Sequence, residues 1–210
     1  RERILKEINA AADFPEWNPG QFLDVAELAF GMAITYDWLY TDLNHKQREK
    51  ISDALMDKAV RPGLEAYRDK AWWTTRNNNW IQVINAGLSA AALAVADKYP
   101  ESCGELLAYI QSAMPGAMRE IYAPNSVYHE GPSYWQYGTT YNLIMIHALQ
   151  TALNTDWDLT KTPGFDQTGL FQMHCISPTY RYFNYADAPE SARPAPALLK
   201  LSKLYGKPAY

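Results

Sequence analysis

Two short segments carry the residue types that could do chemistry. The first is Asn77-Asn78-Asn79-Trp80, which comes directly before a long apolar stretch. Side-chain amides and the unpaired N–H groups at the start of a helix can together bind an anion. A carboxylate on a sugar is an anion of this kind. The alternative is a purely structural role, because asparagine is also a favoured N-cap residue.

The second segment runs from Tyr128 to Gly138 and reads YHEGPSYWQYG. Gly131-Pro132 predicts a turn, Ser133 is a candidate cap, and Tyr134 would lie in the first turn of the following helix. The helix dipole favours negative charge there, so we expect the pKa of Tyr134 to be lowered. The alternative is a hydrogen-bonded tyrosine of the core.

Several neighbours of these segments could contact a ligand. Gln82 lies one helical turn after Asn79 and could share its face. His129 could serve a ligand or only pack in a loop, and Glu130 could orient other groups or be a solvated acid. Aromatic rings can stack on a sugar or fill a core, and a content of 7 Trp and 15 Tyr does not decide between the two. The predicted ligand-contacting residues are Asn77, Trp80, Gln82, His129, Glu130, Trp135, Tyr137 and Trp73.

Helical spacing of apolar residues predicts the elements that position these groups. The chain opens in a helix, and a second helix is expected over 22–40. Asn44 and Gln47 form a capping-box pattern at the start of a helix that reaches Val60. Residues 79–96 are apolar nearly all round and rich in Ala and Gly, which predicts a buried helix closely approached by its neighbours.

The second half of the chain continues the helical pattern. A helix is predicted over 102–121, with Pro115 as a kink or break. A loop precedes a helix over 134–153, and shorter helices are expected over 164–175 and 197–204. The aromatic segment 180–185 could be extended.

Alternation of polar outer helices with apolar inner ones predicts an all-α fold. We expect an α/α toroid, or incomplete α/α barrel of helical hairpins, that takes in residues 1–210 as one domain. A solenoid of short repeats is the rival, but the sequence has no fixed short period. Both ends of the chain suggest a piece of a longer protein that is truncated on each side.

Composition excludes several function classes. The net charge is -4 and no basic stripe is present, so nucleic acid is not an expected partner. The apolar stretch 81–96 is short for a membrane span and is interrupted by polar residues, so no membrane partner is expected. Cys103, Cys175 and the four His lack metal-ligand spacing, and we expect neither a metal nor a cofactor.

The order and spacing of five segments resemble those of heparinase II/III-type polysaccharide lyases and the related alginate lyases. The likeness extends over most of the chain, and its third and fourth segments are the most specific. The five segments are 24–29 (DVAELA), 36–40 (YDWLY), 78–83 (NNWIQV), 130–138 (EGPSYWQYG) and 183–187 (FNYAD).

This resemblance implies a function. Such lyases have an α/α toroid followed by β-sandwich domains, and they are periplasmic or secreted. They bind an acidic polysaccharide and cleave it by β-elimination at a uronic acid. An Asn or His neutralises the C6 carboxylate, a role that falls by position on Asn79, with Asn78 next. A tyrosine protonates the leaving glycosidic oxygen and can also remove the C5 proton, a role that falls on Tyr134.

The sequence departs from the family pattern in two ways. Many relatives carry His where this chain has Asn. They also draw a further His and Tyr from a region after the toroid core, and none of His45, His147 and His174 matches that pattern. The implied partner is therefore a C-terminal β-sandwich domain of the same chain, and we expect the 210 residues alone to be inactive.

Two other functions stay open. A glycoside hydrolase on a helical scaffold would need two carboxylates around the scissile bond, and Asp37, Glu130 and Asp187 are available. A non-catalytic glycan-binding helical module would use the same grooves without chemistry. The polysaccharide itself is not specified, because Arg68, Lys70, Arg76 and Arg119 could bind sulfate or be ordinary surface charges.

Overall fold

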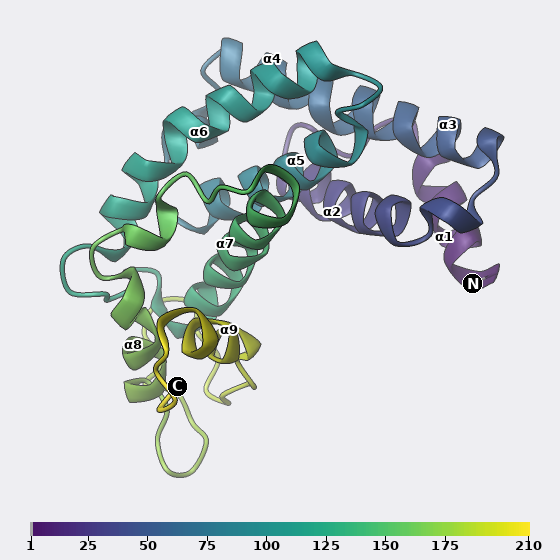
Figure 1. Ribbon diagram of the computed structural model, residues 1–210. Helices are drawn as coiled ribbons and strands as arrows, with labels where there is room; N and C mark the ends of the chain where they lie inside the picture. The colour runs from purple at the N-terminus through teal and green to yellow at the C-terminus, as the bar shows by residue number, and fades with distance from the viewer. Residues whose placement is uncertain (1) are drawn as a thin grey trace. The chain divides into compact units, whose positions relative to one another are not determined.

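The computed structural model describes residues 2–210, and over this range the protein is all-α (Figure 1). The chain forms two compact units. The first takes in the chain up to Thr74 together with Val83–Gln111, and the second takes in Thr75–Gln82 together with Ser112–Tyr210. The helices are α1 (Glu2–Asp13), α2 (Leu23–Trp38), α3 (His45–Leu55), α4 (Arg61–Arg68), α5 (Asn79–Val95), α6 (Pro100–Tyr122), α7 (Gly131–Leu153), α8 (Thr168–His174) and α9 (Pro196–Tyr205).

In the first unit, α3 begins as predicted. The Asn44 side chain accepts the Gln47 N–H at 2.9 Å, and the Gln47 side chain accepts the Asn44 N–H at 2.9 Å. This capping box satisfies two donors that a helix start leaves unpaired. The helix passes through a π-helical turn at Met56–Val60 into α4, which has Pro62 in its first turn. Pro62 has no N–H to donate, and a wider turn before it accommodates the missing bond.

Close packing of α5 confirms the prediction for the part of this helix that lies in the first unit. A Cβ on Gly87 would lie 2.3 Å from the carbonyl oxygen of Ala26 on α2. Any side chain at this position would therefore collide with the backbone of α2. Gly87 is therefore required by this contact, because a residue without a side chain allows the two helix backbones to approach so closely.

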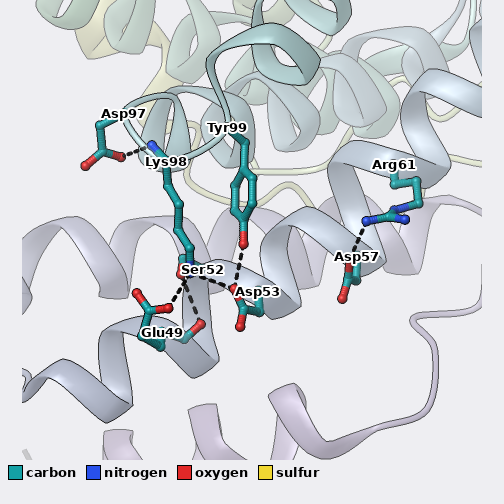
Figure 2. A network of polar contacts seen from close by, with 8 residues as sticks. All are labelled: Glu49, Ser52, Asp53, Asp57, Arg61, Asp97, Lys98 and Tyr99. Atoms are coloured by element: carbon teal, nitrogen blue, oxygen red, sulfur yellow. Dashed lines mark hydrogen bonds and ion pairs between the residues drawn. The ribbon is translucent and has the colours of Figure 1, made fainter.

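A surface network in the first unit joins α3 to the turn between α5 and α6 (Figure 2). Lys98 Nζ lies 2.8 Å from a Glu49 carboxylate oxygen and 2.7 Å from one of Asp53, and it donates to Ser52 Oγ at 3.0 Å. The Tyr99 hydroxyl donates to Asp53 at 2.6 Å. These bonds from Lys98 and Tyr99 lower the pKa of Asp53. Glu49 and Asp53 of α3 are thus linked through one lysine.

The second unit contains the end of α6, where the sequence predicts a kink or a break at Pro115. Pro115 does not end the helix, which continues to Tyr122. Met114, Ala117, Met118 and Ile121 are buried on this part of α6, and their packing outweighs the one hydrogen bond that proline removes.

Helix α7 packs against α8 and α9 in the same unit. It begins at Gly131, three residues before the predicted start, and Pro132 fits the first turn, where the N–H that proline lacks would have no helical partner. The segment 176–191 is not helical. Antiparallel bridges pair Ile176 with Tyr182 and Arg181 with Ser191, in partial agreement with the extended conformation expected for 180–185. Within residues 2–210, no helix is both long and apolar enough to span a membrane.

Candidate functional site

The two chemistry-bearing segments meet in the second unit through Asn79 and Glu130. The Glu130 carboxylate accepts the main-chain N–H of Asn79 at 2.6 Å and its side-chain amide Nδ2 at 2.7 Å. Asn79 is the first residue of α5, so the carboxylate lies at the positive end of the helix dipole. The start of α5 therefore binds a carboxylate of the chain itself, and binding of a ligand anion there stays a prediction.

Asn79 is not accessible to a ligand in this arrangement. Its side chain is 2% exposed, and the Glu130 contact holds its Nδ2 donor. The neighbouring Asn78 is half-buried, and its Oδ1 accepts the N–H of Trp80 at 3.2 Å. That bond caps α5 and leaves the Nδ2 donors of Asn78 available to a ligand. Asn77 is exposed.

Tyr134 is the fourth residue of α7 and is half-buried. Its hydroxyl donates a long hydrogen bond of 3.4 Å to the Asp187 carboxylate. The predicted lowering of its pKa is wrong. Partial burial raises the pKa of Tyr134, the Asp187 carboxylate raises it further, and the Glu130 carboxylate adds to the effect. A phenol whose pKa is raised keeps its proton at neutral pH.

A buried polar network surrounds Gln82, which lies one helical turn after the start of α5. Gln82 donates to the Tyr122 hydroxyl at 2.8 Å and accepts from the Tyr128 hydroxyl at 2.6 Å. The Tyr122 hydroxyl also lies 2.9 Å from Thr139 Oγ1 on α7. Gly138 makes room for this network, because a Cβ there would lie 2.1 Å from Gln82 Oε1. The glycine of the YWQYG segment is thus explained by packing.

The segment 183–187 lies against the start of α7. The Tyr185 hydroxyl donates to the main-chain oxygen of Tyr128 at 2.6 Å, and Asp187 accepts from Tyr134. A Cβ on Gly131 would lie 2.8 Å from the main-chain oxygen of Tyr185. These contacts join segment 183–187 to segment 128–134, which contains Tyr134.

Three residues predicted to contact ligand lie in the interior, which corrects the prediction. Gln82 and Trp135 are fully buried, and Trp135 Nε1 donates to Thr168 Oγ1 at 2.7 Å. Trp73 is 2% exposed and packs against Phe22 in the core of the first unit. Rings and amides that are buried in the core have no exposed surface that a sugar could contact.

The other predicted residues keep some exposure. His129 is exposed, and its ring stacks on Tyr128 with centroids 5.9 Å apart. Trp80 and Tyr137 are half-buried, and the Tyr137 ring meets Tyr141 edge-on. The expected cap Ser133 does not serve, because Glu130 is the N-cap residue of α7 and directs its side chain to α5.

Sequence reasoning missed the tyrosines that frame the site and one of its acids. Tyr128 and Tyr185 stand out in the sequence only as parts of longer segments, and Asp187 only as an acid for a hydrolase. The signal for Asp187 was present, since the FNYAD segment belongs to the family resemblance. Its link to Tyr134 spans 53 residues and has no local pattern.

The buried tyrosines predict a loss of stability at alkaline pH. Burial raises the pKa of Tyr122 to about 12 and that of Tyr128 well above its ordinary value. An unfolded tyrosine loses its proton near pH 10, so the folded state binds more protons above that pH. The free energy of unfolding should be unaffected below about pH 10. It should then fall by about 1.4 kcal/mol per pH unit for each such tyrosine until the pKa of the folded state is reached.

Urea unfolding at pH 8, 10 and 11 measures this dependence. Tyr122→Phe should lower stability at pH 8, because it removes hydrogen bonds, but its decline above pH 10 should be shallower than that of the wild type. Parallel pH profiles for the two proteins would contradict the assignment.

No group of three or more His, Cys, Asp or Glu side chains within residues 2–210 is placed to hold a metal ion. Neither a model of a known protein family nor a curated protein sequence matches the chain.

Proposed function

We propose that the chain is the helical domain of a polysaccharide lyase that cleaves a uronate-containing polymer by β-elimination. The observation that carries the proposal is the Glu130 carboxylate held by the first residue of α5 within electrostatic reach of Tyr134. Elimination requires a group that neutralises the substrate carboxylate, a base and a proton donor, and we propose the first and the last of these at the start of α5 and at Tyr134. The heparinase II/III resemblance supplies the reaction, the α/α toroid and a location outside the cytoplasm.

The proposed neutralising group is Asn78 rather than Asn79. Removal of the C5 proton spreads negative charge onto the C6 carboxylate, and donors placed at that carboxylate stabilise the charge. The half-exposed Asn78 has Nδ2 donors to offer, next to the positive end of α5. Asn79 holds Glu130 and thereby supports its neighbour.

The proposed proton donor is Tyr134. In β-elimination the C4–O bond breaks as a double bond forms between C4 and C5, and the leaving oxygen takes up a proton. A phenol whose pKa is raised is protonated at neutral pH and can supply that proton. By the resemblance, a further His and Tyr come from the region after the toroid core, and we propose that the C5 proton is removed by one of them or, in a syn elimination, by Tyr134 itself. We therefore expect the 210 residues to bind oligosaccharide weakly and to turn over little by themselves.

A second candidate function rests on the two acids near Tyr134. Both Glu130 and Asp187 act electrostatically on its phenol, so two carboxylates lie near one point of the second unit. A glycoside hydrolase uses such a pair, one as acid and one as base or nucleophile. The hydrogen bonds that engage both Glu130 oxygens favour the lyase, because they leave this carboxylate poorly placed to act on a sugar.

One assay separates the two functions. The chain together with its downstream region is incubated with a panel of uronate polymers, including alginate and sulfated and unsulfated glycosaminoglycans. A lyase produces new reducing ends with an equal amount of ultraviolet-absorbing C=C product. Reducing ends without that absorbance would indicate a hydrolase, and binding without either product would indicate a non-catalytic module.

A further inference from the structure

Glu130 connects the starts of two helices. It is the N-cap residue of α7, yet its side chain makes no cap bond there and instead binds Asn79 at the start of α5. Both carboxylate oxygens are used, one on the Asn79 main chain and one on its amide. The starts of α5 and α7 therefore cannot shift against each other without breaking two charge-assisted hydrogen bonds.

A second connection lies one helical turn along α5. Tyr128, two residues before Glu130, donates to Gln82, which is three residues after Asn79. Glu130 therefore contacts the first turn of α5, and Tyr128 contacts the next turn. These two contacts fix both the position and the direction of the loop that leads into α7.

The orientation of the Asn79 amide is fixed by the same contact. A flipped amide would place Oδ1 against the Glu130 carboxylate, so Nδ2 must face it. Oδ1 then lies buried without a hydrogen-bond partner among residues 2–210. An orphaned buried acceptor is unfavourable, so the arrangement is not explained by stability alone.

We propose that Glu130 is a positioning residue: its carboxylate holds the start of α7, with Tyr134, in register with the start of α5, with Asn78. The inference rests on the proposed function for what these two side chains do. Glu130 itself does not touch the substrate.

The first test measures the contact without any activity. Glu130→Gln should lower the melting temperature of the wild type by about 3 °C or more, because its amide NH₂ would face one of the two Asn79 donors. In an Asn79→Asp background the same change should raise the melting temperature. The introduced aspartate and Glu130 repel each other, whereas a glutamine amide can donate to the introduced carboxylate. An equal effect of Glu130→Gln in both backgrounds would overturn the pairing.

The second test separates positioning from stability in the chain joined to its downstream region. Glu130→Gln should lower kcat about tenfold or more, since small misplacements of reacting groups are costly, with KM within about threefold of the wild-type value. Asn44→Ala, which removes a cap in the first unit, should lower the melting temperature but leave kcat unchanged. Equal loss of kcat in the two variants, or a loss confined to KM, would overturn the positioning role.

Failure of this inference can be distinguished from failure of the proposed function. If the wild type cleaves no uronate polymer, the proposed function fails. The positioning role is then tested by a pH titration of the Tyr134 phenol. The titration curve of Tyr134 is obtained by subtracting the curve of the matching Tyr134→Phe variant from that of each protein. Asn79→Ala keeps the Glu130 charge but removes the amide that holds it, and should move that titration if Glu130 sets the place of Tyr134. An unmoved titration would overturn the inference.

Discussion

Replacing Tyr134 by phenylalanine is expected to reduce turnover of a uronate polymer about a hundredfold or more, with a modest change in binding. The substitution removes one oxygen atom and keeps the ring, so packing at the start of α7 should be retained. The lost hydroxyl makes only a 3.4 Å hydrogen bond to Asp187, which limits the cost to stability. The measurement is the rate of C=C formation under saturating substrate, in the chain joined to its downstream region.

Tyr180→Phe is the matched control for this variant. Tyr180 also lies in the second unit, but its ring is 79% exposed and its hydroxyl has no partner among residues 2–210. It should retain wild-type turnover. Unchanged turnover in Tyr134→Phe, or an equal loss in both variants, would contradict the role of Tyr134 as proton donor.

Replacing Asn78 by serine is expected to weaken transition-state stabilisation by about 3 kcal/mol, which is on the order of a hundredfold in kcat/KM. Serine keeps an oxygen that can cap α5 in place of Asn78 Oδ1, but it lacks the amide donors. The loss should therefore appear without a large change in melting temperature.

The variant Asn78→Asp sharpens this test. Aspartate also caps a helix, but its negative charge would repel the uronate carboxylate. Turnover should fall further than in Asn78→Ser, and part of the loss should be recovered at low pH as the new carboxyl is protonated. If turnover by Asn78→Asp equals or exceeds turnover by Asn78→Ser, the ligand does not present a carboxylate to this residue. Asn125→Ala, in an exposed loop of the same unit, should leave turnover unchanged.

Local patterns account for the parts of the fold that could be predicted. The Asn44 and Gln47 capping box depends on residues three apart, and the apolar character of α5 is visible in one stretch of sequence. The sequence did not decide between a kink and a break at Pro115, and α6 continues past it because burial of its neighbours outweighs one missing hydrogen bond. Tertiary packing of this kind leaves no local sequence signal.

In the candidate site, too, the sequence predicts which residues matter but not how tertiary packing places them. Sequence reasoning selected Asn78, Asn79, Glu130 and Tyr134, and the structure brings Asn79 and Glu130 into contact across 51 residues. It could not assign their exposure, because a helix that is apolar all round gives no indication of which polar side chain faces outward. The direction of the Tyr134 pKa shift could not be predicted either, since it depends on partial burial and on the distant Asp187 carboxylate.

The most direct test of the central claim is carboxylate recognition at the start of α5. The 210-residue chain is titrated with a uronate oligosaccharide and, separately, with the same oligosaccharide after reduction of its carboxyl groups to alcohols. Nuclear magnetic resonance follows the side-chain amides of Asn78 and Asn79, the first N–H groups of α5, and the Tyr134 ring, and it detects weak binding. We predict that the uronate shifts the resonances of Asn78 and Tyr134 together and that the reduced sugar leaves them in place. Equal shifts with both sugars, or shifts confined to other parts of the chain, would contradict the account.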